Sequence, residues 1–322
     1  MKRGSEWIVI GLFTGSAFIL YQVSILFFLM AVPLLLLGMK RGVTHLLYGE
    51  AVLLLLIVIQ VYIRTRGIEE EVLRRFFLMM ELAYPISILA GVSILFLAPG
   101  RGLYRLLLST GAVLLISLPI AGYYAGNQEV VGFLREQVGL IIDTLKSGLN
   151  STAAVEGAYP FFAMDAGAVY DFITRLFVRN YLFSFFLVMA LSRLIADRFY
   201  RRLHGGSSFN FVNFHVPELL LWPVLVAWAG VLLDVTAGVP VVGFLFWNYG
   251  MILLFLYGLQ GIGVLKFLFG RYGVSRLIQT LVVFSAAIVL MTPRINLVLI
   301  VGVPLLGLSE YWVHYRDVGK RS

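Results

Sequence analysis

The sequence predicts an all-α protein, a polytopic transmembrane helix bundle, and three observations support this: composition, the lengths of the apolar runs and the placement of charge. Of 322 residues, 60% are hydrophobic and only 13% are charged, whereas roughly a quarter of the residues in soluble domains are charged. The mean hydropathy is +0.93. So few charges could not cover the surface of a water-soluble protein of this size. Composition therefore excludes a soluble enzyme, a disordered chain and a nucleic-acid-binding domain.

The apolar runs predict about ten membrane spans, with a range of about 8–10, because about 20 helical residues cross the hydrocarbon core. The first run, residues 7–38, is too long for one span, and Gln22 and Ser24 interrupt its middle. We therefore expect two short helices there, with one tilted helix as the alternative. The other expected spans are residues 43–63, 76–98, 103–124, 181–196, 217–233, 241–267, 277–291 and 295–313.

Charge placement predicts the orientation of these spans. An even number of spans puts both termini on one side. About 15 Lys and Arg residues fall on that side and about nine on the other. Because Lys and Arg accumulate on the cytoplasmic side, we expect both termini to be cytoplasmic. The first apolar run lacks a small-residue cleavage pattern, so we expect it to be retained as a helix.

The chain divides into N-terminal membrane helices (1–124), an extracytoplasmic amphipathic connector (125–180) and C-terminal membrane helices (181–322). Within the connector, residues 129–146 place apolar side chains on one helical face, and residues 165–179 repeat the pattern. We expect interfacial helices between the fifth and sixth spans. They either connect the two halves or form a lid over an outward-facing cavity.

Polar side chains inside the spans are the candidate functional residues, since a charge at the centre of a membrane helix costs about 2.5–3.5 kcal/mol or more. Asn248 and Gln260 lie in one apolar run and should face the bundle, bonding either another helix or a ligand. Glu81 either binds a ligand or pairs with Arg74 or Arg75. The expected ligand-binding set is Glu81, Asn248, Gln260, Arg294, Asn296 and Glu310.

Other charged residues near the spans have structural explanations. Glu50 either has a function or extends toward Lys40 or Arg41 at the helix end. Arg193 and Asp197 are four residues apart and can form an ion pair along one helix face. Asp234 ends its span, so we expect it to lie in water.

Motifs for catalysis, metals and nucleotides are missing from the sequence. There is no cysteine, which excludes disulfides, thiolate metal sites and cysteine nucleophiles. The four histidines are scattered, and neither a hydrolase elbow nor an ATP-binding loop occurs. We therefore expect no catalytic residues, no metal site and no cofactor, and the protein is not expected to be an enzyme.

Four segments of the C-terminal third carry a resemblance to a known family. They are Phe214-His215-Val216-Pro217 leading to Trp222-Pro223, Asn248 followed by Tyr257-Gly258-Leu259-Gln260-Gly261, Pro293 with Asn296, and Gly307-Leu308-Ser309-Glu310-Tyr311-Trp312 ending in Tyr315-Arg316. In this order they resemble the YybS-like family of predicted bacterial membrane proteins, a domain of unknown function. The resemblance implies a bacterial inner-membrane protein and no established activity.

The N-terminal spans carry a second resemblance. Two short helices, Val32-Pro33 and a Gly38-Met39-Lys40-Arg41-Gly42 turn into the next span look like the start of the substrate-binding components of energy-coupling-factor transporters. Those proteins typically have six spans, about four fewer than expected here.

Two functions are compatible with these patterns. The first is a small-solute binding or transport subunit. Such a subunit would contact the lipid bilayer and a small-molecule ligand, and would need an ion gradient, a partner membrane protein or a partner ATPase for uphill transport. The second is a structural or assembly factor that interacts with lipid or partner proteins. Nucleic acid is not an expected partner of either.

Overall fold

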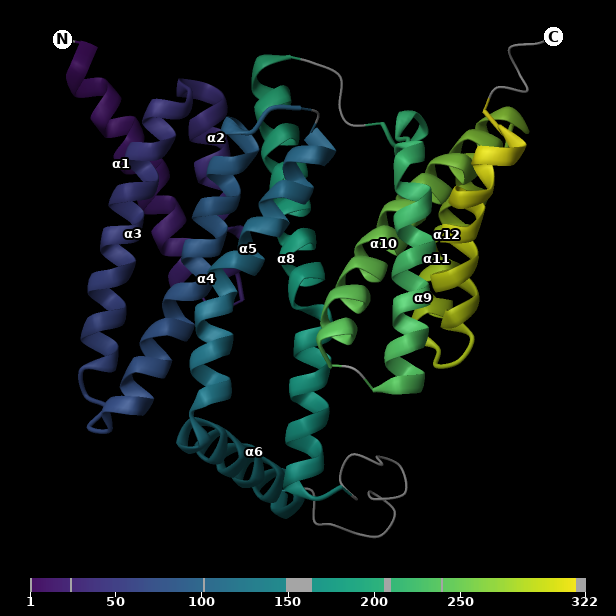
Figure 1. Ribbon diagram of the computed structural model, residues 1–322. Helices are drawn as coiled ribbons and strands as arrows, with labels where there is room; N and C mark the ends of the chain where they lie inside the picture. Colours follow the sequence, from purple (N-terminus) through teal and green to yellow (C-terminus); the bar gives the residue numbers. More distant parts are fainter. Residues whose placement is uncertain are drawn as a thin grey trace. The chain divides into compact units, whose positions relative to one another are not determined.

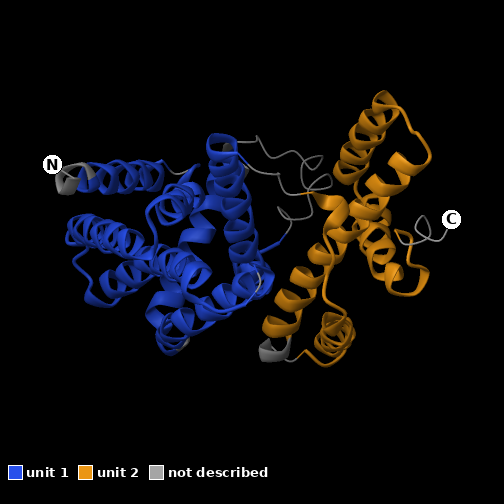
Figure 2. Cartoon of the chain, turned by 90° about the horizontal axis from the view of Figure 1, so that it is seen from above, with its two compact units in different colours: residues 1–207 blue, residues 208–322 orange. Residues whose placement is uncertain are grey.

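Every element in the described part of the chain is a helix, which confirms the all-α prediction (Figure 1). The computed structural model describes residues 2–23, 25–100, 102–148, 164–205, 210–238 and 240–316. The chain divides into two compact units, residues 1–207 and residues 208–322 (Figure 2).

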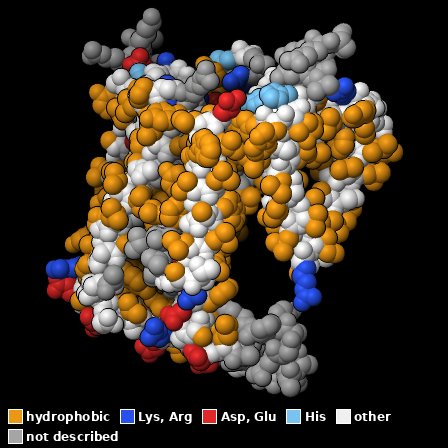
Figure 3. Space-filling model, turned by 45° about the vertical axis from the view of Figure 1, so that its right-hand side comes forward, with side chains coloured by type: hydrophobic (Ala, Val, Ile, Leu, Met, Phe, Trp, Pro, Cys, Tyr) orange, Lys and Arg blue, Asp and Glu red, His pale blue; other side chains and the backbone are white. Residues whose placement is uncertain are grey.

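Among the described residues, six helices are long and apolar enough to cross a membrane: Val43–Thr65, Glu71–Leu97, Gly102–Tyr124, Glu218–Ala237, Gly243–Arg271 and Asn296–Val313. Glu6–Gln22 and Arg276–Met291 are apolar but shorter. Hydrophobic side chains cover the helices, and charged side chains gather toward the helix ends (Figure 3). The protein is therefore a membrane protein whose helices contact the lipid bilayer.

The first apolar run forms two helices, as predicted. α1 (Lys2–Gln22) is followed by a 3₁₀ turn η1 (Phe27–Met30) and by α2 (Ala31–Arg41). The 11 residues of α2 extend about 16 Å, roughly half of the hydrocarbon core. The structure therefore does not confirm that the second half of this run is a membrane span of its own. Ser24, one of the two predicted interruptions, lies outside the described residues.

α2 is the buried centre of unit 1. It contacts α1, α3 (Val43–Thr65), α4 (Glu71–Leu97) and α8 (Ala166–His204), and most of its side chains are buried. A Cβ on Gly38 would lie 2.6 Å from the ring of Phe96, so the ring packs directly on the α2 backbone. His45 Nε2 at the start of α3 lies 4.0 Å from Glu6 Oε2 near the start of α1. The α1–α2 hairpin therefore begins and ends at the same end of the unit.

The predicted amphipathic stretch forms α6 (Gln128–Gly148), which follows α5 (Gly102–Gly126) and lies crosswise at the end of α5 and α8 (Figure 1). Val130 of α6 packs against Leu73 and Phe76 of α4. The expectation of a second amphipathic helix separate from the span at 181–196 is wrong. α8 is one helix of 39 residues, and the expected boundary at residue 180 falls inside it.

Unit 2 is arranged around one long helix, α10 (Pro240–Arg271). α10 packs against α9 (Leu221–Ala237), α12 (Asn296–Val313) and the 3₁₀ turn η3 (Phe211–Asn213). A second turn, η4 (Glu218–Leu220), leads into α9, and α11 (Arg276–Met291) packs on α12. α10 and α12 run in the same direction, and α11 returns the chain between them (Figure 1).

Glycines let α10 and α12 approach to backbone contact. A Cβ on Gly261 would lie 2.0 Å from the Val303 carbonyl oxygen, and one on Gly307 would lie 2.1 Å from that of Tyr257. Real Cβ atoms do not come so close, so only glycine fits at either position. Small residues serve this purpose between membrane helices. This approach positions Glu310, one turn beyond Gly307, against Gln260 of α10.

Candidate functional site

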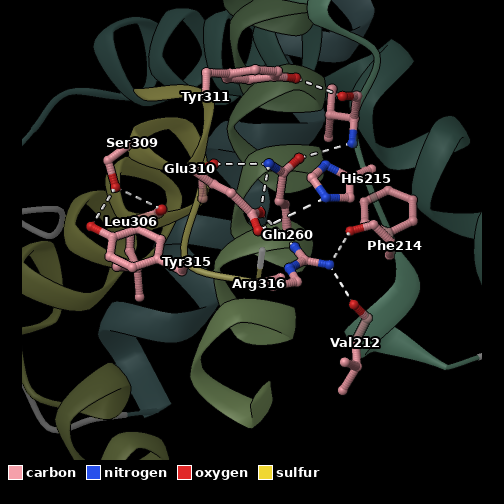
Figure 4. A network of polar contacts seen from close by, with 12 residues as sticks. Val212, Phe214, His215, Gln260, Leu306, Ser309, Glu310, Tyr311, Tyr315 and Arg316 are labelled. Carbon is pink, nitrogen blue, oxygen red and sulfur yellow. Dashed lines mark hydrogen bonds and ion pairs between the residues drawn. The ribbon is translucent and has the colours of Figure 1, made fainter. Parts of the chain in front are cut away.

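Gln260 and Glu310, two of the predicted site residues, meet between α10 and α12 (Figure 4). Gln260 Nε2 donates to Glu310 Oε2 at 3.1 Å and to the Gly307 carbonyl at 3.0 Å. Gln260 Oε1 accepts the backbone N–H of Val216 at 2.8 Å. Both ends of the amide are therefore bonded, and Gln260 links the two helices to the segment that precedes α9.

Arg316 supplies the charge that balances Glu310. Its Nη2 lies 2.6 Å from Glu310 Oε2, and both side chains are largely buried. Its Nη1 donates to the carbonyl of Val212 and, at 3.1 Å, to that of Phe214. A buried carboxylate is tolerated only when it is paired in this way. The guanidinium also ties the end of α12 to the segment that precedes α9.

His215 connects this buried carboxylate with the exterior. Its Nε2 lies 3.8 Å from Glu310 Oε1, and its side chain is 56% exposed whereas that of Glu310 is 3% exposed. Oε1 has no hydrogen-bond partner among the described residues, and neither has Arg316 Nε. Beside them, Tyr311 OH donates to the Val216 carbonyl at 2.6 Å. The site thus holds a carboxylate oxygen that can accept a further hydrogen bond and a guanidinium N–H that can donate one.

These residues form what we call the polar centre: His215, Gln260, Glu310, Tyr311 and Arg316, with the backbone of residues 212–216. The described residues contain no group of three His, Cys, Asp or Glu side chains that could hold a metal ion. The chemistry available at the polar centre is therefore hydrogen bonding and ion pairing.

The other predicted residues of unit 2 lie away from the polar centre. Asn248 precedes Gln260 by three turns of α10, about 18 Å, and its buried amide donates to the Phe244 carbonyl at 2.7 Å. Arg294 is exposed in the turn before α12, with φ 73°. Asn296 begins α12, about 21 Å along the helix from Glu310. The structure does not bring Asn248, Gln260 and Arg294 together in one cavity.

Glu81 lies in unit 1, on α4. Arg64 Nη1 of α3 lies 3.3 Å from Glu81 Oε2, and both side chains are partly exposed. The predicted pairing with Arg74 or Arg75 is wrong, because Glu81 pairs with Arg64, and Arg75 pairs with Glu71 on its own helix. The partner comes instead from the end of the preceding helix, which no spacing along α4 could indicate.

Asp234 is a second buried carboxylate of unit 2, and the prediction that it lies in water is wrong. It is 5% exposed, and Trp247 Nε1 of α10 donates to its Oδ2 at 2.9 Å. A Cβ on Gly243 would lie 2.6 Å from Asp234 Oδ1. The absence of a side chain at Gly243 makes room for this carboxylate between α9 and α10.

Two further expectations for unit 1 have opposite outcomes. Arg193 and Asp197 form the expected ion pair, with Nε 3.2 Å from Oδ2. Glu50 does not extend toward Lys40 or Arg41. Its carboxyl group is buried and bonds Ser93 of α4, which the sequence alone did not indicate.

The residues that sequence reasoning missed at the polar centre are Arg316 and His215. Both lie within segments quoted for the family resemblance, but neither was expected to bind. Arg316 follows Glu310 by six residues, outside the three- and four-residue spacings that bring helix side chains together. The left-handed conformation of His314, with φ 48°, ends α12 and allows the chain to turn Arg316 back. The sequence does not show this turn, and it therefore does not indicate that Arg316 returns to Glu310.

Comparison with known proteins identifies the family. The model of DUF2232, described as a family of predicted membrane proteins, matches residues 8–304. The match covers most of the chain, so the chain belongs to this family, in agreement with the YybS-like resemblance. No curated protein and no solved structure matches the chain. The similarity of the N-terminal helices to energy-coupling-factor components therefore stays a prediction.

Proposed function

We propose that this member of the DUF2232 family of predicted membrane proteins is a small-solute binding or transport subunit, and that the polar centre of unit 2 forms part of its binding site. One observation carries the proposal. Glu310 is buried among apolar helices, yet one of its oxygens has no hydrogen-bond partner among the described residues and lies 3.8 Å from the exposed His215. Ionisable groups within membrane helices mark ligand or ion pathways by default.

The open groups indicate the kind of solute. Glu310 Oε1 can accept a hydrogen bond, and Arg316 Nε can donate one. A small polar molecule that carries both a donor and an acceptor would satisfy both atoms. Such a solute would gain more from them here than in water, because a low dielectric strengthens hydrogen bonds. A purely apolar ligand would leave both atoms unsatisfied.

The expected topology places this site in a bacterial inner membrane. Unit 1 supports the charge-based assignment, because its α1–α2 hairpin brings Lys40 and Arg41 to the end of the unit that carries Glu6. We propose about ten crossings, with both termini cytoplasmic. Since the sequence has no ATP-binding loop, uphill transport would require an ion gradient or a partner ATPase. We assign no catalytic role to any residue.

Native mass spectrometry of the full-length protein, purified in mild detergent, tests the proposal. The wild-type protein is expected to retain a small polar molecule, and Glu310→Gln is expected to lose at least about 90% of it, the tenfold change that corresponds to about 1.4 kcal/mol. Glu81→Gln is the matched control and should retain the molecule. An empty wild-type protein, or equal retention in Glu310→Gln and the wild type, would contradict the proposal.

A structural or assembly factor is the second candidate, and the bonding of Gln260 favours it. Both ends of that amide bond groups of the protein itself, as expected of a clamp. This candidate predicts that Gln260→Ala lowers the thermal stability of the protein while solute uptake by cells stays unchanged. Loss of uptake in a variant that keeps its stability, such as His215→Gln, would instead favour the first candidate.

A further inference from the structure

A buried carboxyl group lies in the interior of unit 1. It belongs to Glu50 in the first half of α3, a residue that is only 7% exposed. The neighbouring Gly49 shows how tightly this part of α3 packs. A Cβ there would lie 2.9 Å from Leu37 of α2 and 3.1 Å from Thr14 of α1. Glu50 therefore lies where α3 packs against other helices of the unit and not on the lipid-facing side of α3.

One hydroxyl group is the bonding partner of this carboxyl group. Ser93 Oγ of α4 donates to Glu50 Oε2. Oε1 has no hydrogen-bond partner among the described residues. No Lys, Arg or His of the described part of the chain forms an ion pair with Glu50, in contrast to Glu310 and Glu81.

Besides Glu50 itself, α3 and the helices packed against it, α1, α2 and α4, carry several charged and titratable groups among the described residues. On α3, His45 faces Glu6 of α1, and Arg64 pairs with Glu81 of α4. The other groups are Tyr48 and Tyr62 of α3, Tyr21 of α1, Lys40 and Arg41 of α2, and Glu71, Arg74, Arg75 and Tyr84 of α4. Lys40 and Arg41 are exposed. None of the described cations lies within ion-pair distance of Glu50.

An ionised carboxylate would be expensive at this position. Removing a charge from water without pairing costs many kcal/mol, and buried acids avoid that cost by becoming neutral. One hydroxyl donor does not replace the hydration of a carboxylate. A bound metal ion would need several ligands, and the described residues hold no group of three His, Cys, Asp or Glu side chains that could bind one. A neutral acid needs neither a counter-ion nor ligands.

We propose that Glu50 is held as the protonated carboxylic acid and is a proton-binding site inside unit 1. Protonation removes the negative charge that a cation would otherwise have to balance. The site is separate from the polar centre of unit 2 and stands whether or not a solute binds there. In a transport subunit it would provide a group that takes up and releases a proton as its surroundings open to water.

Infrared spectroscopy of the full-length protein in lipid tests this inference. The C=O stretch of a protonated carboxylic acid is separate from the carboxylate bands and shifts on exchange into D₂O. At neutral pH the wild-type spectrum is expected to contain this band, and Glu50→Gln, which is nearly isosteric, is expected to lose it. Glu81→Gln and Glu310→Gln are matched controls that keep it. A band unaffected by Glu50→Gln, or lost in a control instead, would overturn the inference.

Two measurements on the wild-type protein keep the test independent of whether Glu50→Gln folds. An apolar carbodiimide reacts with protonated carboxyl groups in membranes, and peptide mass spectrometry locates the adduct. The reagent reacts with the protonated form, and the pairing of Glu81 with Arg64 favours its ionised form. Labelling of Glu50 is therefore expected to exceed that of Glu81 by about tenfold or more. Adducts at Glu81 with none at Glu50 would contradict the inference. So would protection of Glu50 by sodium ions, because a metal cation would then occupy the site.

Discussion

Glu310 in unit 2 and Glu50 in unit 1 are the same residue type in similar apolar helices, but their surroundings differ. Glu310 Oε2 receives a guanidinium at 2.6 Å and an amide donor at 3.1 Å. Glu50 receives one serine hydroxyl and no ion-pair partner among the described residues. Burial alone therefore does not decide whether a carboxyl group in a membrane helix is ionised or protonated. The presence of a cation decides whether it is an ion pair or a neutral acid.

The largest expected effect comes from removing the cation of Glu310. Arg316→Met leaves Glu310 buried without a counter-charge, and breaking a buried pair in this way costs about 3–5 kcal/mol. The free energy of unfolding of the purified protein, measured by denaturant titration in detergent, should fall by that amount.

The matched control is Arg64→Met, which breaks the partly exposed pair with Glu81. Exposed pairs contribute about 0–1 kcal/mol, so this variant should remain close to the wild type. Equal losses in the two variants would show that Glu310 is not neutralised by Arg316, and the contrast between the two buried carboxyl groups would disappear.

An intermediate effect is expected from separating the helices that create the polar centre. In Gly307→Ala the new Cβ would lie 2.1 Å from the Tyr257 carbonyl, so α12 must move away from α10. Such overpacking costs about 1–3 kcal/mol. In Gly302→Ala, on the same helix, the new Cβ meets nothing within 4 Å, so this variant should be neutral or slightly stabilising. Thermal unfolding of both purified variants measures the difference. Similar melting temperatures for the two variants would contradict the close packing.

The smallest effect concerns a third environment, an exposed pair of carboxyl groups outside the membrane spans. A hydrogen bond and repulsion from Glu129 of α6 raise the pKa of Glu70 above its ordinary 4.5. An acid with a raised pKa binds more protons in the folded state, so its contribution is present at low pH and is lost as pH rises through that raised value. The protection of α6 amides against hydrogen exchange, taken relative to the intrinsic exchange rate at each pH, should therefore fall slightly across that range.

Glu70→Gln removes the titrating group of that pair and should flatten this pH dependence of α6. Glu136→Gln, another exposed position on α6, serves as its control and should leave the dependence in place. An unchanged pH dependence in Glu70→Gln would show that the two carboxyl groups do not share a proton. The contrast between carboxyl groups would then be limited to the two buried ones, Glu310 and Glu50.

The helices were predictable because hydrophobicity and length act locally along the chain. The break near Gln22, the amphipathic helix after residue 128 and the pair of Arg193 with Asp197 were all confirmed. The number of spans was less predictable, because α2 is mostly apolar but is only 11 residues long. Its burial within unit 1 accounts for its hydrophobicity. An apolar run therefore does not distinguish a lipid-facing helix from one enclosed by protein.

Composition and hydropathy alone indicate a helical membrane protein whose few polar side chains must turn away from lipid, because hydrocarbon cannot solvate them. The sequence also singled out Gln260 and Glu310. Only the tertiary structure decided their partners: Arg316 for Glu310, Ser93 for Glu50, Arg64 for Glu81 and Trp247 for Asp234. The reason is physical. Burial depends on local composition, whereas the charge state of a buried group depends on atoms that the fold brings together from distant helices or turns.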